Sequence, residues 1–181
     1  MLSFSILLFA TATLGVNMHI PNYFTSAGYS AAFAAAIFAA YNFIMIFGKL
    51  ALGTVIDRYG IRNSMIYIFI VGLSAMALIT IAGDIKWLAY VFAVVAGFAA
   101  AIMTIPAALW TAAIMGKKDF AIIYSVMNVF LTLGVALGPP ISGYIFDAQS
   151  SYLPAIKLWM VVLAISMILA LLSYQKRPII D

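Results

Sequence analysis

The sequence predicts an all-α integral membrane protein, because its composition leaves no room for a soluble fold. Of its 181 residues, 67% are hydrophobic and 8% are charged, and the mean hydropathy is +1.18. Ordinary soluble domains are only about half apolar. A helix that crosses the roughly 30 Å hydrocarbon core needs about 20 residues. The chain therefore has room for about six transmembrane helices and for no extramembrane domain.

Apolar runs between polar residues, glycine and proline define six expected spans in a single domain, residues 1–181. They cover residues 3–24, 31–54, 64–82, 87–115, 120–146 and 153–174. The connections are short, so adjacent spans are expected to run antiparallel. The first run has no basic residue before it and is longer than a signal-peptide core, so we interpret it as a retained helix.

Basic residues are distributed unevenly between the two sides of this topology. Lys86 and Lys157 fall on one side, and a larger group falls on the other: Arg58, Arg62, Lys117, Lys118, Lys176 and Arg177. Lysine and arginine gather on the cytoplasmic side of membrane proteins. Both termini are therefore expected in the cytoplasm, and the protein in a bacterial inner membrane or a plasma membrane. In a membrane protein the side on which the basic residues lie matters more than their total, so the high pI does not lead us to expect nucleic acid as a partner.

The sequence carries no pattern that is typical of catalysis or of a bound cofactor. It has no cysteine, which removes a disulfide framework, a thiolate metal site and a cysteine nucleophile. Its single histidine, His19, has no evident partner for nucleophilic chemistry. A phosphate-binding Gly-Lys-Ser/Thr loop is missing as well. We therefore expect neither an enzyme nor a cofactor.

Small residues and prolines mark where the helices should pack and bend. Gly134 and Gly138 form a GxxxG pair, which allows two helices in lipid to approach closely. Pro106, Pro139 and Pro140 remove backbone donors inside expected spans, so each is expected to kink its helix.

The most specific segment is GTVIDRYGIR, residues 53–62, after the second expected span. Gly53 allows two helix ends to approach, Asp57 can cap a helix or pair with a base, and Gly60 can form a tight turn. The segment resembles the signature loop of the major facilitator superfamily at Gly53, Asp57, Arg58, Gly60 and Arg62. This resemblance implies that Asp57, Arg58 and Arg62 support a closed inner gate. The alternative is a loop that only anchors two helices at the interface.

A second resemblance lies in GVALGPPISGYIFDAQSSY, residues 134–152, which is similar to helix eleven of the oxalate/formate-antiporter and monocarboxylate-transporter branches. The six spans then correspond to helices seven to twelve, one half-bundle of the fold. The resemblance implies secondary transport of a small organic anion by alternating access, driven by a proton or by exchange. One half supplies only part of such a site. The expected partner is an amino-terminal six-helix half or a second copy; the alternative is a non-transporting remnant or a partner-binding subunit.

Lys49 is the leading candidate for binding the transported solute. A basic side chain inside a span costs a few kcal/mol unless it faces a polar interior or snorkels to the interface. In the monocarboxylate and oxalate relatives, a basic residue at the matching position binds the substrate carboxylate. Asn42 lies seven residues earlier on the same helical face, which extends a polar stripe.

Further candidates for substrate binding lie in the fifth and first spans. Tyr124, Asn128 and Thr132 recur at four-residue spacing, so they share one helix face and are expected to face the bundle interior. They can line a cavity or form interhelical hydrogen bonds worth about 1 kcal/mol per pair. Oxalate exchangers carry a cation in the middle of this helix and this chain does not, which argues against a dicarboxylate and leaves a monocarboxylate or another kind of solute open. His19 can couple transport to protons or can simply bond between helices.

Overall fold

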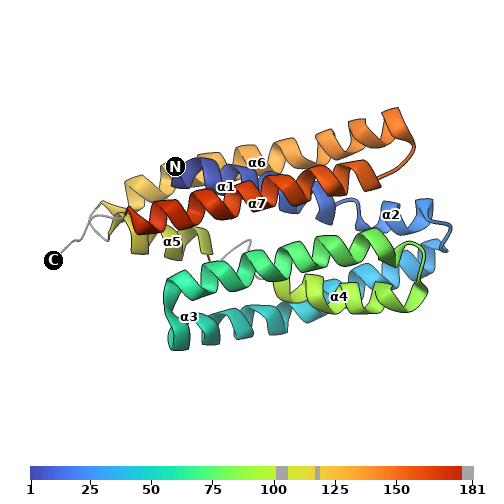
Figure 1. Cartoon of the computed structure of the whole chain (residues 1–181), viewed down its shortest axis with the longest axis horizontal. Helices are drawn as coiled ribbons and strands as arrows, with labels where there is room; N and C mark the ends of the chain where they lie inside the picture. Colours follow the sequence, from blue (N-terminus) through green and yellow to red (C-terminus); the bar gives the residue numbers. More distant parts are fainter. Residues whose placement is uncertain (101–105, 117–118, 177–181) are drawn as a thin grey trace.

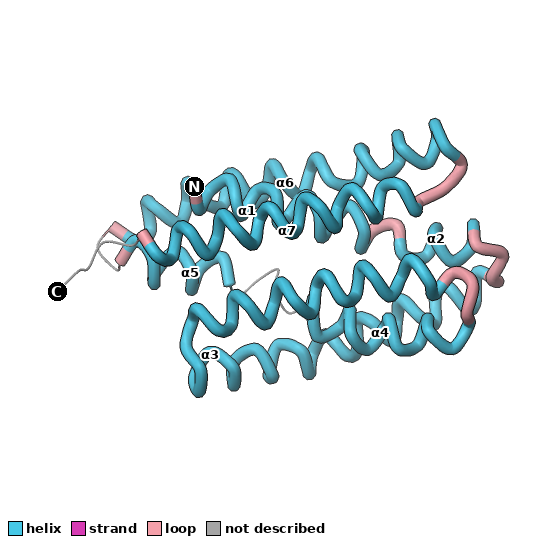
Figure 2. The backbone as a smooth tube through the Cα atoms, viewed as in Figure 1, coloured by secondary structure: helices cyan, strands magenta, loops and turns pink. Residues whose placement is uncertain are grey.

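The computed structural model describes residues 1–100, 106–116 and 119–176, which are almost entirely helical and contain no β-strand (Figure 2). The helices are α1 (Leu2–Asn17), α2 (Ile20–Ser26), α3 (Ala31–Ala82), α4 (Lys86–Ala100), α5 (Pro106–Met115), α6 (Phe120–Gln149) and α7 (Leu153–Gln175). Part of the fourth expected span, together with Lys117, Lys118 and Arg177, lies outside the described residues.

The predicted fold class, an all-α membrane protein, is confirmed. Three helices, α3, α6 and α7, are long and apolar enough to cross a membrane. The pair α1 and α2 meets the same test when it is counted as one span bent by 43°. The remaining described helices, α4 and α5, are shorter, and the total of six spans stays a prediction.

Gly60 reverses the direction of α3. A straight helix of 52 residues would be about 78 Å long, more than twice the hydrocarbon thickness. Gly60 instead has φ 76° and ψ 175°, a conformation that glycine adopts readily, and the residues on both sides of it stay helical. Figure 1 shows the result as two antiparallel arms, residues 31–59 and 61–82. The connection expected over residues 57–63 is thus a single residue, because one glycine suffices for the turn.

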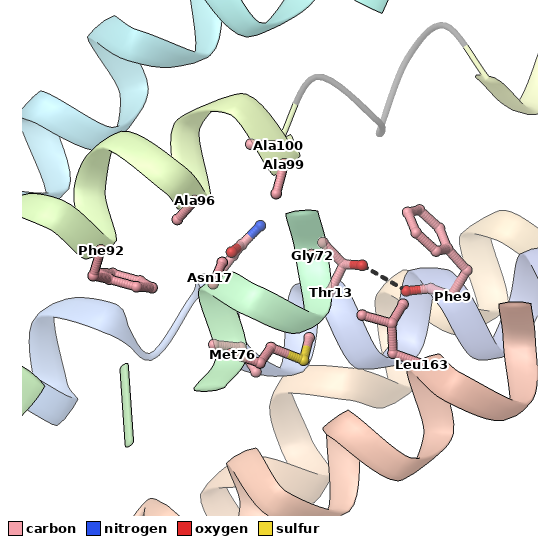
Figure 3. A pocket seen from close by; sticks show the side chains of 12 residues that line it. Phe9, Thr13, Asn17, Gly72, Met76, Phe92, Ala96, Ala99, Ala100 and Leu163 are labelled. Atoms are coloured by element: carbon pink, nitrogen blue, oxygen red, sulfur yellow. Dashed lines mark hydrogen bonds between the residues drawn. The ribbon is translucent and has the colours of Figure 1, made fainter. Parts of the chain in front are cut away.

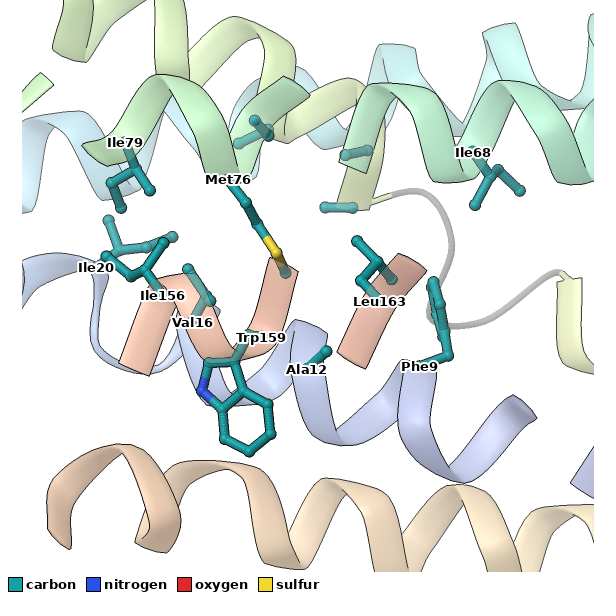
Figure 4. Packing of buried hydrophobic residues seen from close by; sticks show 14 of the residues in the cluster. Phe9, Ala12, Val16, Ile20, Ile68, Met76, Ile79, Ile156, Trp159 and Leu163 are labelled. Carbon is teal, nitrogen blue, oxygen red and sulfur yellow. The ribbon is translucent and has the colours of Figure 1, made fainter. Parts of the chain in front are cut away.

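The helices pack in two groups. α1 packs against α6 and α7, whereas α3 packs mainly against α4 (Figure 1). The contact of α3 with α7 joins the two groups, and buried side chains such as Met76, Ile79, Ile156 and Leu163 fill the space there (Figure 4). Lipid tails are as apolar as these side chains, so the side chains gain little by moving out of lipid into the contact. Close packing between the helices therefore stabilises it.

Helices α1 and α6 approach each other closely, and this contact depends on the GxxxG pair. A Cβ atom at Gly134 would overlap the carbonyl oxygen of Leu7, and one at Gly138 would overlap that of Thr11. One turn later, Ser142 Oγ donates to Gly15 O at 2.7 Å and accepts from Trp159 Nε1 at 2.7 Å. The prediction that the glycine pair packs helices is confirmed.

The first span is broken between α1 and α2. α1 ends at Asn17, and Pro21 lies in the first turn of α2. Because proline has no N–H, the carbonyl of Asn17 loses the donor that a continuous helix would supply. Pro106 is the first described residue of α5, so the kink expected there lies outside the described residues. The other two prolines do not interrupt their helix, because α6 remains helical through Pro139 and Pro140.

The glycine contact predicts that Gly138→Ala destabilises the chain by about 1–3 kcal/mol, because the added methyl group must push α6 away from α1. Gly143→Ala is the matched control, since a Cβ there meets nothing within 4 Å. Thermal unfolding in detergent should show a lower midpoint for Gly138→Ala and an unchanged or higher one for Gly143→Ala. Equal midpoints for the two variants would contradict the packing.

Candidate functional site

The signature segment surrounds the reversal in α3. Asp57, Arg58, Gly60 and Arg62 are exposed at this end of the bundle. Asp57 and the two arginines form no ion pair within the described residues. The predicted tight turn at Gly60 is confirmed by its positive φ. The charged side chains are therefore available to a partner rather than used inside the described chain.

Gly53 does not make the close helix approach expected of it within the described residues. A Cβ at this position would meet no atom within 4 Å. The arm of α3 continues to residue 59, so Gly53 lies in a helix and not at its end. Its small surface is left open on the outside of this arm.

Lys49 and Asn42 lie on the first arm of α3, and both are half-buried. Asn42 Nδ2 donates to Phe38 O at 2.7 Å, a bond within its own helix. Lys49 forms no ion pair among the described residues. Two turns of helix, about 12 Å, separate Lys49 from Asp57. The Lys49 side chain would have to extend along this distance to snorkel to the charged turn.

The polar stripe on α6 does not face the interior of this bundle. Asn128 and Thr132 are exposed, and Thr132 Oγ1 donates to Asn128 O at 2.8 Å within the helix. Tyr124 is half-buried, and its ring stacks on Phe120 with centroids 5.5 Å apart. The expectation of an interior-facing stripe is wrong for Asn128 and Thr132. The glycine face of α6 packs instead, because only that face lets α6 approach the backbone of α1.

The two groups of predicted site residues are not brought together within the chain. α3 packs on α4, α7 and α2, whereas α6 packs chiefly on α1. No hydrogen bond or ion pair joins Lys49 or Asn42 to Tyr124, Asn128 or Thr132 among the described residues. If they act on one solute, they do so across a space that this half-bundle does not enclose.

His19 lies at the break in the first span and bonds to α6. Its Nε2 is 3.0 Å from Pro139 O, and because a carbonyl only accepts, Nε2 carries the proton. Nδ1 is buried and has no partner among the described residues. The ring also lies beside Tyr152, with centroids 5.1 Å apart. The interhelical bond that the sequence left as an alternative to proton coupling is therefore present.

A pocket at the seam between the two helix groups was not predicted. It is lined by Thr13 and Asn17 of α1, Met76 of α3, Phe92 and Ala96 of α4 and Leu163 of α7, among others (Figure 3). Its volume of about 30 Å³ has room for roughly two water molecules. Asn17 extends into it without a hydrogen bond from its amide to another described residue (Figure 3). The sequence contains one indication of this pocket, because Thr13 and Asn17 have the same four-residue spacing as the polar stripe on α6.

Helix α4 separates this seam pocket from Lys49. Gly48, the neighbour of Lys49, packs against Gly97 of α4. A Cβ added at Gly48 would lie 2.7 Å from the carbonyl oxygen of Gly97. Ala96, Ala99 and Ala100 line the pocket from another face of α4. The seam pocket is therefore separate from the surroundings of Lys49.

The described part of the chain contains no cluster of three or more histidine, cysteine, aspartate or glutamate side chains that could hold a metal ion.

Comparison with known proteins gives one family. The model of the Major Facilitator Superfamily matches residues 1–179, which covers nearly the whole chain and includes the signature segment. No curated protein matches the sequence.

The His19 geometry yields a test of its role. His19→Leu should destabilise the chain by about 1 kcal/mol, because Pro139 O loses its donor, whereas His19→Gln keeps an N–H and should retain most of the stability. Thermal unfolding measures both. If His19→Gln matches the wild type in stability but loses the response of uptake to a pH gradient, His19 couples protons; an intact response leaves it a structural bond.

Proposed function

The chain belongs to the major facilitator superfamily, a family of membrane secondary transporters, and from this we propose that it moves a small organic anion, such as a monocarboxylate, by alternating access. Lys49 carries the proposal. It is a half-buried cation inside a membrane-spanning arm, without an ion pair among the described residues. A buried cation is costly unless a counter-charge reaches it, and a carboxylate solute would supply that charge.

The polar residues of α6 support one carboxylate rather than two. Residues 120–149 contain no lysine or arginine, so Tyr124, Asn128 and Thr132 offer only neutral hydrogen-bonding groups. Together with Asn42 they suit the uncharged part of a solute whose single carboxylate binds at Lys49. The driving force that we propose is a proton gradient or exchange, with His19 as the candidate for proton coupling.

The proposed carrier is complete only with a partner. We assign the chain to helices seven to twelve, in the oxalate/formate or monocarboxylate branch, so that an amino-terminal half or a second copy closes the site. Gly53 supports this, since its open surface gives a partner helix room to approach. Asp57, Arg58 and Arg62 would then contact the partner and support the closed inner gate.

The orientation that we propose places this gate in the cytoplasm. Figure 1 shows the start of α1 and the end of α7 at the same end of the bundle as the Gly60 reversal. Arg58, Arg62 and Lys176 lie there as well, which supports cytoplasmic termini by the distribution of positive charge. A bacterial inner membrane or a plasma membrane fits this arrangement.

Uptake of radiolabelled formate, lactate and pyruvate into proteoliposomes tests the substrate class. The chain is reconstituted alone and with a candidate amino-terminal half, with and without a pH gradient. Lys49→Ala should lower uptake about tenfold or more, the loss expected for a charged hydrogen bond, and Lys49→Arg should retain part of it. Lys157→Ala, an exposed lysine of α7, is the control. Unchanged uptake by Lys49→Ala would show that this lysine does not bind the solute, and no uptake under any condition would favour a non-transporting module.

The absence of native cysteine makes the gate testable with a single reporter. In a Thr132→Cys background, Asp57→Asn should change the rate at which a membrane-impermeant thiol reagent labels the reporter from the cytoplasmic side, because a weakened gate opens more often. Asp147→Asn, at the far end of α6, should leave the rate unchanged. Equal rates for the Asp57→Asn variant and its parent would refute a gating role for Asp57.

A further inference from the structure

A second polar site lies at the other end of the bundle, away from Gly60. We call it the α2 cleft. It has a volume of about 200 Å³ and is lined by Tyr23, Ser26, Ala27, Thr80, Gly83, Asp84, Ser150, Ser151, Tyr152 and Leu153. These residues come from three segments: α2, the end of α3 with the turn that follows it, and the turn between α6 and α7. A separate hollow, lined by Asn22, Thr25, Ser26, Phe146 and Tyr152, shares Ser26 and Tyr152 with the cleft.

Three of the six hydroxyl groups that line the cleft, those of Tyr23, Ser26 and Thr80, offer only acceptors to a ligand. Tyr23 Oη donates to Ile79 O at 2.6 Å, Ser26 Oγ to Tyr23 O at 2.8 Å, and Thr80 Oγ1 to Ala77 O at 2.7 Å. Each of these protons is used within the chain, so only oxygen lone pairs remain for a ligand. Ser151 Oγ already accepts from the backbone N–H of Leu153 and can rotate its own proton. The side of the cleft formed by Tyr23, Ser26 and Thr80 therefore presents acceptors.

Asp84 is the charged side chain of the cleft, and it has no counter-ion among the described residues. The nearest basic residue in sequence, Lys86, is directed elsewhere: its Nζ lies 5.3 Å from the centre of the Phe33 ring. The local field of the cleft is negative, which disfavours an anion and favours a cation.

The floor of the cleft is fixed by a tight contact. Tyr23 is buried and hydrogen-bonded to α3, and a Cβ at Gly83 would lie 2.5 Å from its hydroxyl oxygen. Glycine at position 83 thus lets the tyrosine hydroxyl reach the end of α3. This contact holds α2 against the turn that carries Asp84, so the acceptors are positioned before any ligand arrives.

We propose that the α2 cleft binds a primary ammonium group, with Asp84 as its counter-ion and the hydroxyl oxygens of Tyr23, Ser26 and Thr80 as further acceptors. An ammonium group has three N–H donors and no acceptor, which matches this lining. The cleft volume suits a small organic amine, and one carboxylate is a poor set of ligands for a divalent metal ion. The site is independent of Lys49 and of the transported solute.

Two sources supply this chemistry: a free amine in solution and the headgroup of an amine-bearing lipid at the bilayer surface. The probe for both is ethanolammonium, detected by saturation-transfer NMR on the full chain in detergent. The wild type should give a signal, and Asp84→Asn should weaken binding by about fivefold or more, as expected when a charge-assisted hydrogen bond is lost. Asp147→Asn removes an exposed carboxylate outside the cleft and should bind like the wild type. Tetramethylammonium, which has no N–H, should give no signal.

Nanodiscs separate the two sources. If lipid is the natural ligand, phosphatidylethanolamine discs should suppress the ethanolammonium signal and phosphatidylcholine discs should preserve it; a signal in both indicates a soluble amine. No signal for the folded wild type, or equal loss in Asp84→Asn and Asp147→Asn, would overturn the proposal. Displacement of the probe by calcium at tenfold lower concentration would overturn it in favour of a metal site.

Discussion

The architecture depends on the close approach of α6 to α1 over Gly134 and Gly138. In a bilayer, two apolar helices gain little by leaving lipid for each other, so the contact must come from dense packing and from hydrogen bonds that lipid cannot offer. The glycines bring the backbones together, and only then can Ser142 reach the carbonyl of Gly15 and receive the indole N–H of Trp159. On the other side of α1, Ser5 and Ser166 exchange bonds with each other's backbone oxygens. The group formed by α1, α6 and α7 is thus held together by buried interhelical hydrogen bonds, while its outer surface is apolar.

The same contact positions the break in the first span. His19 reaches Pro139 because α6 lies so close to α1, and this bond holds the start of α2 beside the proline pair. The break in the first span therefore lies beside the two prolines of α6. Nearby, Asn17 enters the seam pocket at the end of α1 (Figure 3). Irregular backbone inside a membrane is tolerated where protein or a cavity satisfies it, and both conditions are met here.

The sequence predicted the features that depend on local residue type. Composition gave the all-α membrane class, Gly134 and Gly138 gave a packing face, and Gly60 gave a turn, because each follows from one physical requirement. The sequence did not predict features that depend on which face of a helix a neighbouring helix covers. Asn128 and Thr132 form a regular stripe, but the adjacent glycine face determines the orientation of α6, so the stripe is exposed. Gly53 has the right residue type for a close contact, yet a Cβ there would meet no atom of the described chain. The roles of Lys49 and the charged turn stay predictions, since no described residue forms an ion pair with them.

The single-residue reversal in α3 also constrains how its two arms lie in the bilayer. They are joined without a flexible linker, and neither the exposed Asp57 nor the arginines beside it can be placed in hydrocarbon at reasonable cost. The charged turn therefore belongs at one membrane surface, and the far ends of both arms belong together at the other.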